Sequence, residues 1–184
     1  GGESDLTDRI AEGLLIATRD AGRRAIADPR DYEARATLMW AGSVSHNDYT
    51  GCGRKRLFPV HKLEHELSAF RDEIAHGAGL SVLFPAWAEH EMQYDYPRFA
   101  QFANRVLGVE MDFEHPERTA REGIRTLRRF FEEIGMPTHL SQLSIKPENY
   151  EKLAANTVRT VNGPVKSYSP LDEKAIIEIY RLAE

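Results

Sequence analysis

Hydrophobic residues recur every three or four positions along nearly the whole chain, which is the spacing of amphipathic helices. In residues 8–25, Ile10, Leu14 and Ala17 follow these steps behind Thr7, which is a plausible N-cap. Prolines, glycines and short polar stretches separate the periodic segments. The pattern predicts helices at residues 8–25, 31–46, 59–71, 76–87, 97–107, 116–134, 147–158 and 170–183.

One of these segments is apolar on most of its faces. Residues 76–87 include Leu83 and other large hydrophobic residues, so we expect this helix at the centre of the domain, with a kink at Pro85. Residues 47–56 are polar and rich in glycine, which predicts a loop. No strand pair or internal repeat stands out. The prediction is an all-α fold, an irregular bundle of roughly seven or eight helices in one domain, 1–184.

Composition narrows the class of protein. The 184 residues are 41% hydrophobic and 29% charged, as in globular domains. With 24 Lys and Arg against 29 Asp and Glu and no dense basic block, nucleic-acid binding is disfavoured, and no apolar run of membrane-spanning length occurs. The single cysteine, Cys52, fits a reducing compartment and predicts a cytoplasmic location. Residues 1–4 resemble a cut end rather than a targeting segment.

Three of the seven histidines fall within sixteen positions. His61 and His65 are four residues apart, so on a helix they share one face, and His76 follows beside Gly77. Three neutral imidazoles at this spacing are a credible partial ligand set for Zn²⁺ or Fe²⁺. An ordinary solvated or core-edge histidine pair explains the spacing equally well. The other four histidines lack such company: His46 stays open, and His90, His115 and His139 suit cap or surface roles.

The same segment allows two other functions. Residues 61–65 match the H-x-x-E-H pattern of inverted zinc peptidases, in which Glu64 would activate water. A third, carboxylate ligand would come from a later helix, where none stands out among Glu89, Glu91, Glu132 and Glu133. Glu64 could equally pair with Lys62 or Arg71 at the surface. The third hypothesis is a non-enzymatic helical interaction domain with incidental histidines.

A longer pattern resembles a known family. The blocks at residues 61–69 (HKLEHELSA), 76–80 (HGAGL) and 83–87 (LFPAW), preceded by Gly51 and Gly53, resemble iron-containing alcohol dehydrogenases, in particular the NAD(P)H-dependent butanol dehydrogenase branch. The resemblance extends over nearly the whole chain, and its further positions are Asn47, Arg54, residues 8–15 and 130–140, Gly163, Leu171 and Ala183.

The resemblance implies a two-domain oxidoreductase of which this chain is the C-terminal, helical, metal-bearing domain. His61 and His76 match two metal ligands, for Fe²⁺ or Zn²⁺, and His65 matches a catalytic histidine near the nicotinamide. An Asp and a further His ligand belong to a helix that precedes residue 8, and the missing N-terminal domain binds most of the NAD(P)H. The substrate would be a small alcohol or aldehyde. The fragment alone is predicted to be inactive, and a surface made for a missing domain leaves a homodimer open.

Two features depart from the family pattern. The separation of His61 and His76 is fifteen residues where the family has fourteen, and a longer turn within residues 71–75 would absorb the extra one. The basic run at residues 54–56 would suit phosphate near a cleft entrance, but we favour a solvated loop.

Overall fold

The computed structural model describes residues 4–184, so the predicted cut end lies largely outside the described residues. Within them the chain forms eight α-helices and three short 3₁₀ helices, with one isolated β-bridge, which confirms the all-α prediction. The α-helices are α1 (Asp5–Ala27), α2 (Tyr32–Ser45), α3 (Pro59–Phe70), α4 (His76–Glu91), α5 (Tyr96–Leu107), α6 (Pro116–Glu133), α7 (Tyr150–Thr160) and α8 (Glu173–Leu182). The 3₁₀ helices are η1 (Met92–Tyr94), η2 (Leu140–Leu143) and η3 (Pro147–Asn149).

The beginnings of three helices differ from the prediction. Helix α7 begins at Tyr150 rather than at residue 147, since Pro147–Asn149 form the 3₁₀ helix η3. Thr7 is not the N-cap of α1, because the helix begins at Asp5 and the Thr7 hydroxyl donates to the carbonyl of Cys52 instead. The last helix begins at Glu173 rather than at residue 170. Leu171 exchanges two backbone hydrogen bonds of 2.9 Å with Val165, and this bridge keeps the chain extended up to the capping residue, Asp172.

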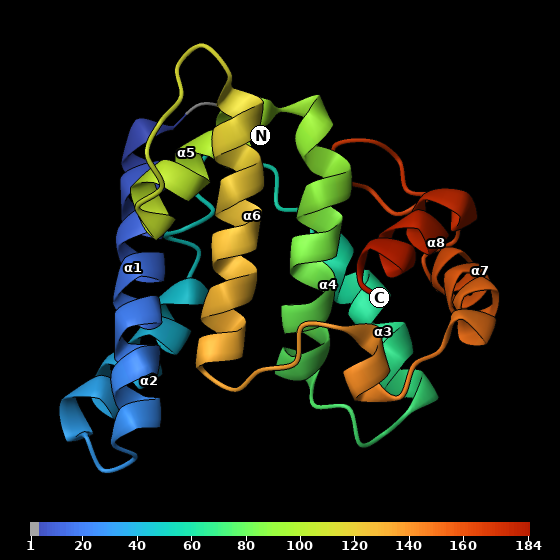
Figure 1. Ribbon diagram of the computed structural model, residues 1–184, viewed down its shortest axis with the longest axis horizontal. Coiled ribbons are helices and arrows are strands. Elements are labelled where there is room, and N and C mark those ends of the chain that lie inside the picture. Colours follow the sequence, from blue (N-terminus) through green and yellow to red (C-terminus); the bar gives the residue numbers. More distant parts are fainter. Residues whose placement is uncertain (1–3) are drawn as a thin grey trace.

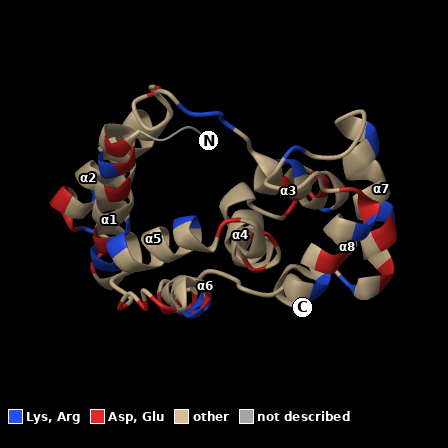
Figure 2. Ribbon diagram, turned by 90° about the horizontal axis from the view of Figure 1, so that it is seen from above, with Lys and Arg blue, Asp and Glu red and all other residues tan. Residues whose placement is uncertain are grey.

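The helices are arranged around α4. Helices α1 and α2 lie on one side of it and α3, α7 and α8 on the other, while α5 and α6 lie between α1 and α4 (Figure 1). Figure 2 shows α4 seen end-on between the two groups. Its side chains enter both hydrophobic clusters: Leu83 packs with residues of α3, α7 and α8, and Ala88 packs with residues of α5 and α6. The apolar segment is therefore central, as its sequence predicts.

Helices α5 and α6 approach each other closely at a glycine. A Cβ atom added to Gly123 of α6 would lie 2.3 Å from the Cβ of Ala103 on α5. Only glycine fits this crossing, and the close contact fixes the two helices that form one wall of the cleft described below.

No helix of residues 4–184 is long and apolar enough to cross a membrane.

Candidate metal centre and apolar cleft

The three histidines predicted as site residues meet at the junction of α3 and α4. Ring centroids are 5.1 Å apart for His61 and His76, 5.5 Å for His65 and His76, and 6.4 Å for His61 and His65. His61 and His65 come from successive turns of α3, and His76 is the first residue of α4. The structure thus brings together the residues that the sequence predicts as a site; their ligation of a metal stays a prediction.

The turn between the two helices occupies residues 71–75, where a longer turn is expected from the sequence. Arg71 is extended after the last turn of α3, and the amide of Ile74 donates back to the Arg71 carbonyl at 3.0 Å. Ile74 is buried in the core shared by α3, α4, α7 and α8. The turn at residues 71–75 returns His76 to His61, while the longer spacing relative to the family stays a prediction.

Glu64 is the unexpected member of the cluster. It lies on α3 between the two histidines, yet it is completely buried. One carboxylate oxygen, Oε2, contacts Nδ1 of His76, and the other, Oε1, accepts a 2.5 Å hydrogen bond from the Ser68 hydroxyl. Single ligand atoms from Glu64, His65 and His76 lie within 4.8 Å of one another. The predicted surface pair with Lys62 or Arg71 is wrong, because the side chain points into the protein.

This burial also argues against peptidase chemistry. A water-activating carboxylate must reach water and substrate, whereas both oxygens of Glu64 are engaged inside the protein. The nominated third ligands are engaged elsewhere. Glu91 accepts from Ser167 and Ser169, and Glu133 pairs with Arg23 at 2.8 Å. Glu89 pairs with Arg128 at 3.1 Å, and Glu132 accepts from the Thr138 hydroxyl at 3.4 Å.

The environment of His61 favours its neutral form. Partial burial lowers the pKa of the His61 imidazole, and the nearby rings of His76 and His65 lower this pKa further. Neutral imidazole is the form that ligates metals, because a protonated ring offers no lone pair.

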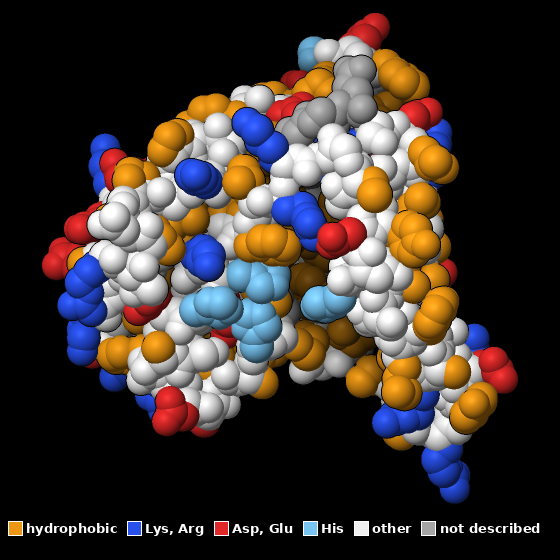
Figure 3. Space-filling view, turned by 180° about the vertical axis from the view of Figure 1, so that it is seen from behind, with side chains coloured by type: hydrophobic (Ala, Val, Ile, Leu, Met, Phe, Trp, Pro, Cys, Tyr) orange, Lys and Arg blue, Asp and Glu red, His pale blue; other side chains and the backbone are white. Residues whose placement is uncertain are grey.

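An apolar cleft of about 570 Å³ begins at His61. Its walls come from α1, α3, α4, α5 and α6. Aromatic side chains line it from α4, α5, α6 and the turn before α3: they are Phe58, Phe84, Phe102, Phe130 and Phe131. Phe58 packs edge-on against His61, with ring centroids 5.4 Å apart. Figure 3 shows histidine side chains gathered beside a hollow lined by hydrophobic groups. The hollow is suited to an alkyl or other apolar chain with its polar end at the histidines.

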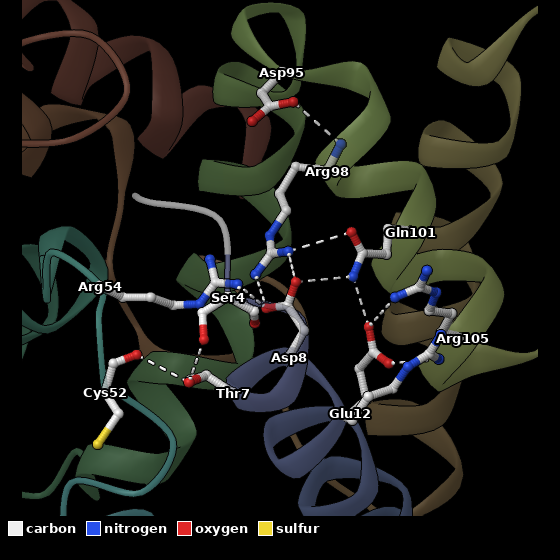
Figure 4. A network of polar contacts seen from close by, with 11 residues as sticks. Ser4, Thr7, Asp8, Glu12, Cys52, Arg54, Asp95, Arg98, Gln101 and Arg105 are labelled. Carbon is white, nitrogen blue, oxygen red and sulfur yellow. Dashed lines mark hydrogen bonds and ion pairs between the residues drawn. The ribbon is translucent and has the colours of Figure 1, made fainter.

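A polar network secures the loop that leads into α3. The Asp8 carboxylate of α1 accepts hydrogen bonds of 2.6 and 2.7 Å from Arg98 of α5 and pairs with Arg54 of the loop (Figure 4). The bonds from Arg98 and the nearby positive charges hold the pKa of Asp8 far below its usual range. Gln101 of α5 extends the network to Glu12 at 2.7 Å.

This network corrects the prediction for the basic run. Arg54 is not a solvated loop residue, because its guanidinium is largely buried against Asp8 and also donates to the Ser4 carbonyl. Arg56 is exposed and pairs with Asp48 across the same loop. Sequence reasoning missed the network because its members lie far apart in the chain.

Together, the fold and site define a helical domain that presents a histidine cluster at the edge of an apolar cleft. The chain belongs to the Fe-containing alcohol dehydrogenase family, whose C-terminal domain it matches over residues 2–183. It is 35% identical over 175 residues to NADH-dependent butanol dehydrogenase A of Clostridium acetobutylicum, a match that covers 95% of this chain and 44% of the relative. It is 31% identical over 143 residues to NADPH-dependent aldehyde reductase YqhD of Escherichia coli, covering 78% of this chain and 36% of the relative.

A solved structure agrees with these relationships. The crystal structure of NADH-dependent butanol dehydrogenase A from Thermotoga maritima superposes with a TM-score of 0.93 at 30% identity, covering 100% of this chain and 47% of that one. The chain therefore spans less than half the length of the relatives that it matches.

Proposed function

We propose that this chain is the metal-bearing helical domain of an NAD(P)H-linked alcohol dehydrogenase or aldehyde reductase. His61 and His76 hold Fe²⁺ or Zn²⁺, and His65 is the catalytic histidine. The observation that carries the proposal is the meeting of three imidazoles at the edge of an apolar cleft, in a chain of the Fe-containing alcohol dehydrogenase family. A helix that precedes residue 8 supplies the other ligands, and an N-terminal domain supplies most of the NAD(P)H site.

The donor set fits the proposed metal. Imidazole nitrogen is a good ligand for both Fe²⁺ and Zn²⁺, and His61 sits where its neutral form is favoured. Two histidines are fewer than the ligands of a stable site. We therefore propose that the 184-residue chain alone binds metal weakly and does not turn over substrate.

When bound, the metal acts as a Lewis acid that polarises the oxygen of a carbonyl or alcohol substrate. The walls of the cleft bury the alkyl part of a small alcohol or aldehyde and keep water away from the reacting carbon. His65 is solvent-exposed and close to His76, so one of its ring nitrogens can pass a proton between the substrate oxygen and water. The hydride is exchanged with the nicotinamide.

Two further proposals concern the whole protein. Cys52 is free and exposed, which agrees with a cytoplasmic location. The N-terminal domain is the proposed partner of this chain, and pairing of two copies stays a prediction.

The test uses the protein in which this chain follows its nucleotide-binding domain, loaded with Fe²⁺ or Zn²⁺ under anaerobic conditions. We expect NAD(P)H oxidation with butanal, and a loss of roughly 100-fold or more in kcat/KM together with bound metal in His61→Ala and His76→Ala. His115→Ala is the control, because His115 is exposed and its recorded ion-pair partner is the neighbouring Glu117. Unchanged metal content in both site variants would support the non-enzymatic hypothesis instead.

A further inference from the structure

We infer that Glu64 is the positioning residue of His76: its buried carboxylate accepts the Nδ1–H of His76, selects this tautomer, and leaves Nε2 with a free lone pair. The consequence for metal binding rests on the proposed function, but the tautomer itself does not. Three features of the structure carry the inference.

The first feature is the pair of hydrogen-bond donors, Ser68 and His76, that compensates the burial of the Glu64 carboxylate. Burying a carboxylate is costly unless hydrogen bonds replace its water. Within residues 4–184 the one ion-pair partner of Glu64 is His76, so no lysine or arginine neutralises it. The Ser68 hydroxyl binds Oε1, which leaves Oε2 to His76 Nδ1. An acceptor-only carboxylate can bind Nδ1 only if that nitrogen carries the proton.

The second feature is the space that α4 leaves for this carboxylate. A Cβ atom added to Gly79 would lie 2.5 Å from Cγ of Glu64 and 2.7 Å from Oε1. Neither distance is sterically permitted, so a residue with a side chain at position 79 would displace the carboxylate. The glycine allows α3 and α4 to close around Glu64, one turn after His76.

The third feature connects Glu64 to the turn that determines where His76 begins α4. The Ser68 hydroxyl lies 2.5 Å from Oε1 of Glu64 and 3.2 Å from the carbonyl oxygen of Ile74. A hydroxyl carries one hydrogen, so Ser68 shares it between these two acceptors, and the shorter contact is to the carboxylate. Ser68 thereby sits between the carboxylate and the turn at residues 71–75, so the same short segment orients both the Glu64 acceptor and the backbone of His76.

The chemical consequence is a preset ligand nitrogen. In a metal-binding histidine, the hydrogen bond made by one ring nitrogen determines which nitrogen faces the metal. With Nδ1–H held by Glu64, Nε2 of His76 carries the free lone pair and needs no change of tautomer before it binds a cation. His65 lacks a comparable buried acceptor among the described residues, which suits a ring that must exchange its proton.

The decisive measurement is two-bond ¹⁵N–¹H NMR of the 184-residue chain, labelled at histidine and kept metal-free with a chelator at about pH 8. We expect His76 to show a protonated Nδ1 and an unprotonated Nε2, with the signals assigned by their loss in His76→Ala. In Glu64→Met, which replaces the carboxylate by an apolar side chain of similar length, the ratio should shift toward Nε2–H. A wild-type His76 that is mainly Nε2–H would overturn the inference.

A matched control comes from another histidine. Nδ1 of His46 lies 2.9 Å from the Gly42 carbonyl and 2.8 Å from the Ser45 hydroxyl, both in α2, so changes at Glu64 should leave its tautomer unaltered. If Glu64→Met does not fold, as judged by far-UV circular dichroism, the wild-type spectrum still decides the tautomer. Ser68→Ala then serves as the second variant, because loss of one donor should loosen the carboxylate and raise the Nε2–H fraction of His76.

The complete enzyme separates this inference from the proposed function. There, Glu64→Met should weaken metal binding by about 10- to 100-fold, measured by competition with a chelator. An Nδ1–H tautomer in an enzyme that neither binds metal nor reduces aldehydes would uphold the positioning role and refute the proposed function. Full metal affinity in Glu64→Met would refute the positioning role toward the metal while leaving the proposed function intact.

Discussion

Two buried carboxylates, that of Asp8 in α1 and that of Glu64 in α3, have different surroundings. Asp8 meets two guanidinium groups, Arg54 and Arg98, and the amide of Gln101. Glu64 meets a neutral hydroxyl and one imidazole. Both arrangements satisfy a buried anion, but permanently charged donors only hold chain segments together. An imidazole has a second nitrogen, so the same kind of bond at Glu64 also prepares a group for chemistry.

The largest expected effect concerns the guanidinium-bound carboxylate. Asp8→Ala leaves Arg54 and Arg98 without their shared anion and should lower the free energy of unfolding by about 2 to 3 kcal/mol. This is less than for a fully buried pair because Arg98 is partly exposed. Urea unfolding followed by circular dichroism measures it, with the exposed first-turn residue Asp5, changed to Ala, as control. A loss below about 0.5 kcal/mol would show that the network does not secure the loop.

A second prediction perturbs the other carboxylate through its steric environment. Gly79→Ala should cost about 1 to 2 kcal/mol of unfolding free energy, because the new methyl group collides with Glu64. Gly13→Ala in α1 is the matched control, since nothing lies within 4 Å of its added Cβ and alanine is the better helix former. This control should gain up to about 1 kcal/mol. Equal signs for the two variants would mean that the close approach at Gly79 is not as described.

The smallest predicted effect is the pH dependence of the contribution that Asp8 makes to the free energy of unfolding. The bonds from Arg98 lower the pKa of Asp8 in the folded protein, so its contribution to stability is present above the ordinary aspartate pKa. That contribution is lost as the pH falls toward the lowered pKa. The stability difference between wild type and Asp8→Ala should therefore shrink by about 1 kcal/mol from pH 5 to pH 2. A difference that grows on acidification would contradict this assignment.

The helical period predicted most of the architecture because nearly every helix buries one apolar stripe. It failed where polar groups decide the structure. Helix α1 begins before Thr7, whose hydroxyl donates to the Cys52 carbonyl instead of capping the helix, and α8 begins late because Leu171 pairs with Val165. Such individual polar contacts have no period in the sequence.

The candidate site divides in the same way. The three histidines could be predicted as a group because their spacing and neighbours are distinctive. Glu64 had a usable signal, since it shares a helix face with Val60, Leu63 and Leu67, all of which are buried. Charged residues are rarely buried, so this position is assigned to the surface by sequence reasoning alone. The partner of the carboxylate, Nδ1 of His76, could be identified only from the structure.

Ile74 determines which changes of length this site tolerates. Its side chain is anchored in the core, and its carbonyl oxygen lies 3.2 Å from Ser68, just two residues before His76. We expect residues inserted or deleted before Ile74 to alter only the exposed part of the turn, at Asp72 and Glu73. A residue inserted between Ile74 and His76 would rotate the start of α4 by about 100° and move the imidazole away from its partners. The number of residues between His61 and His76 can therefore change before Ile74, but not between Ile74 and His76.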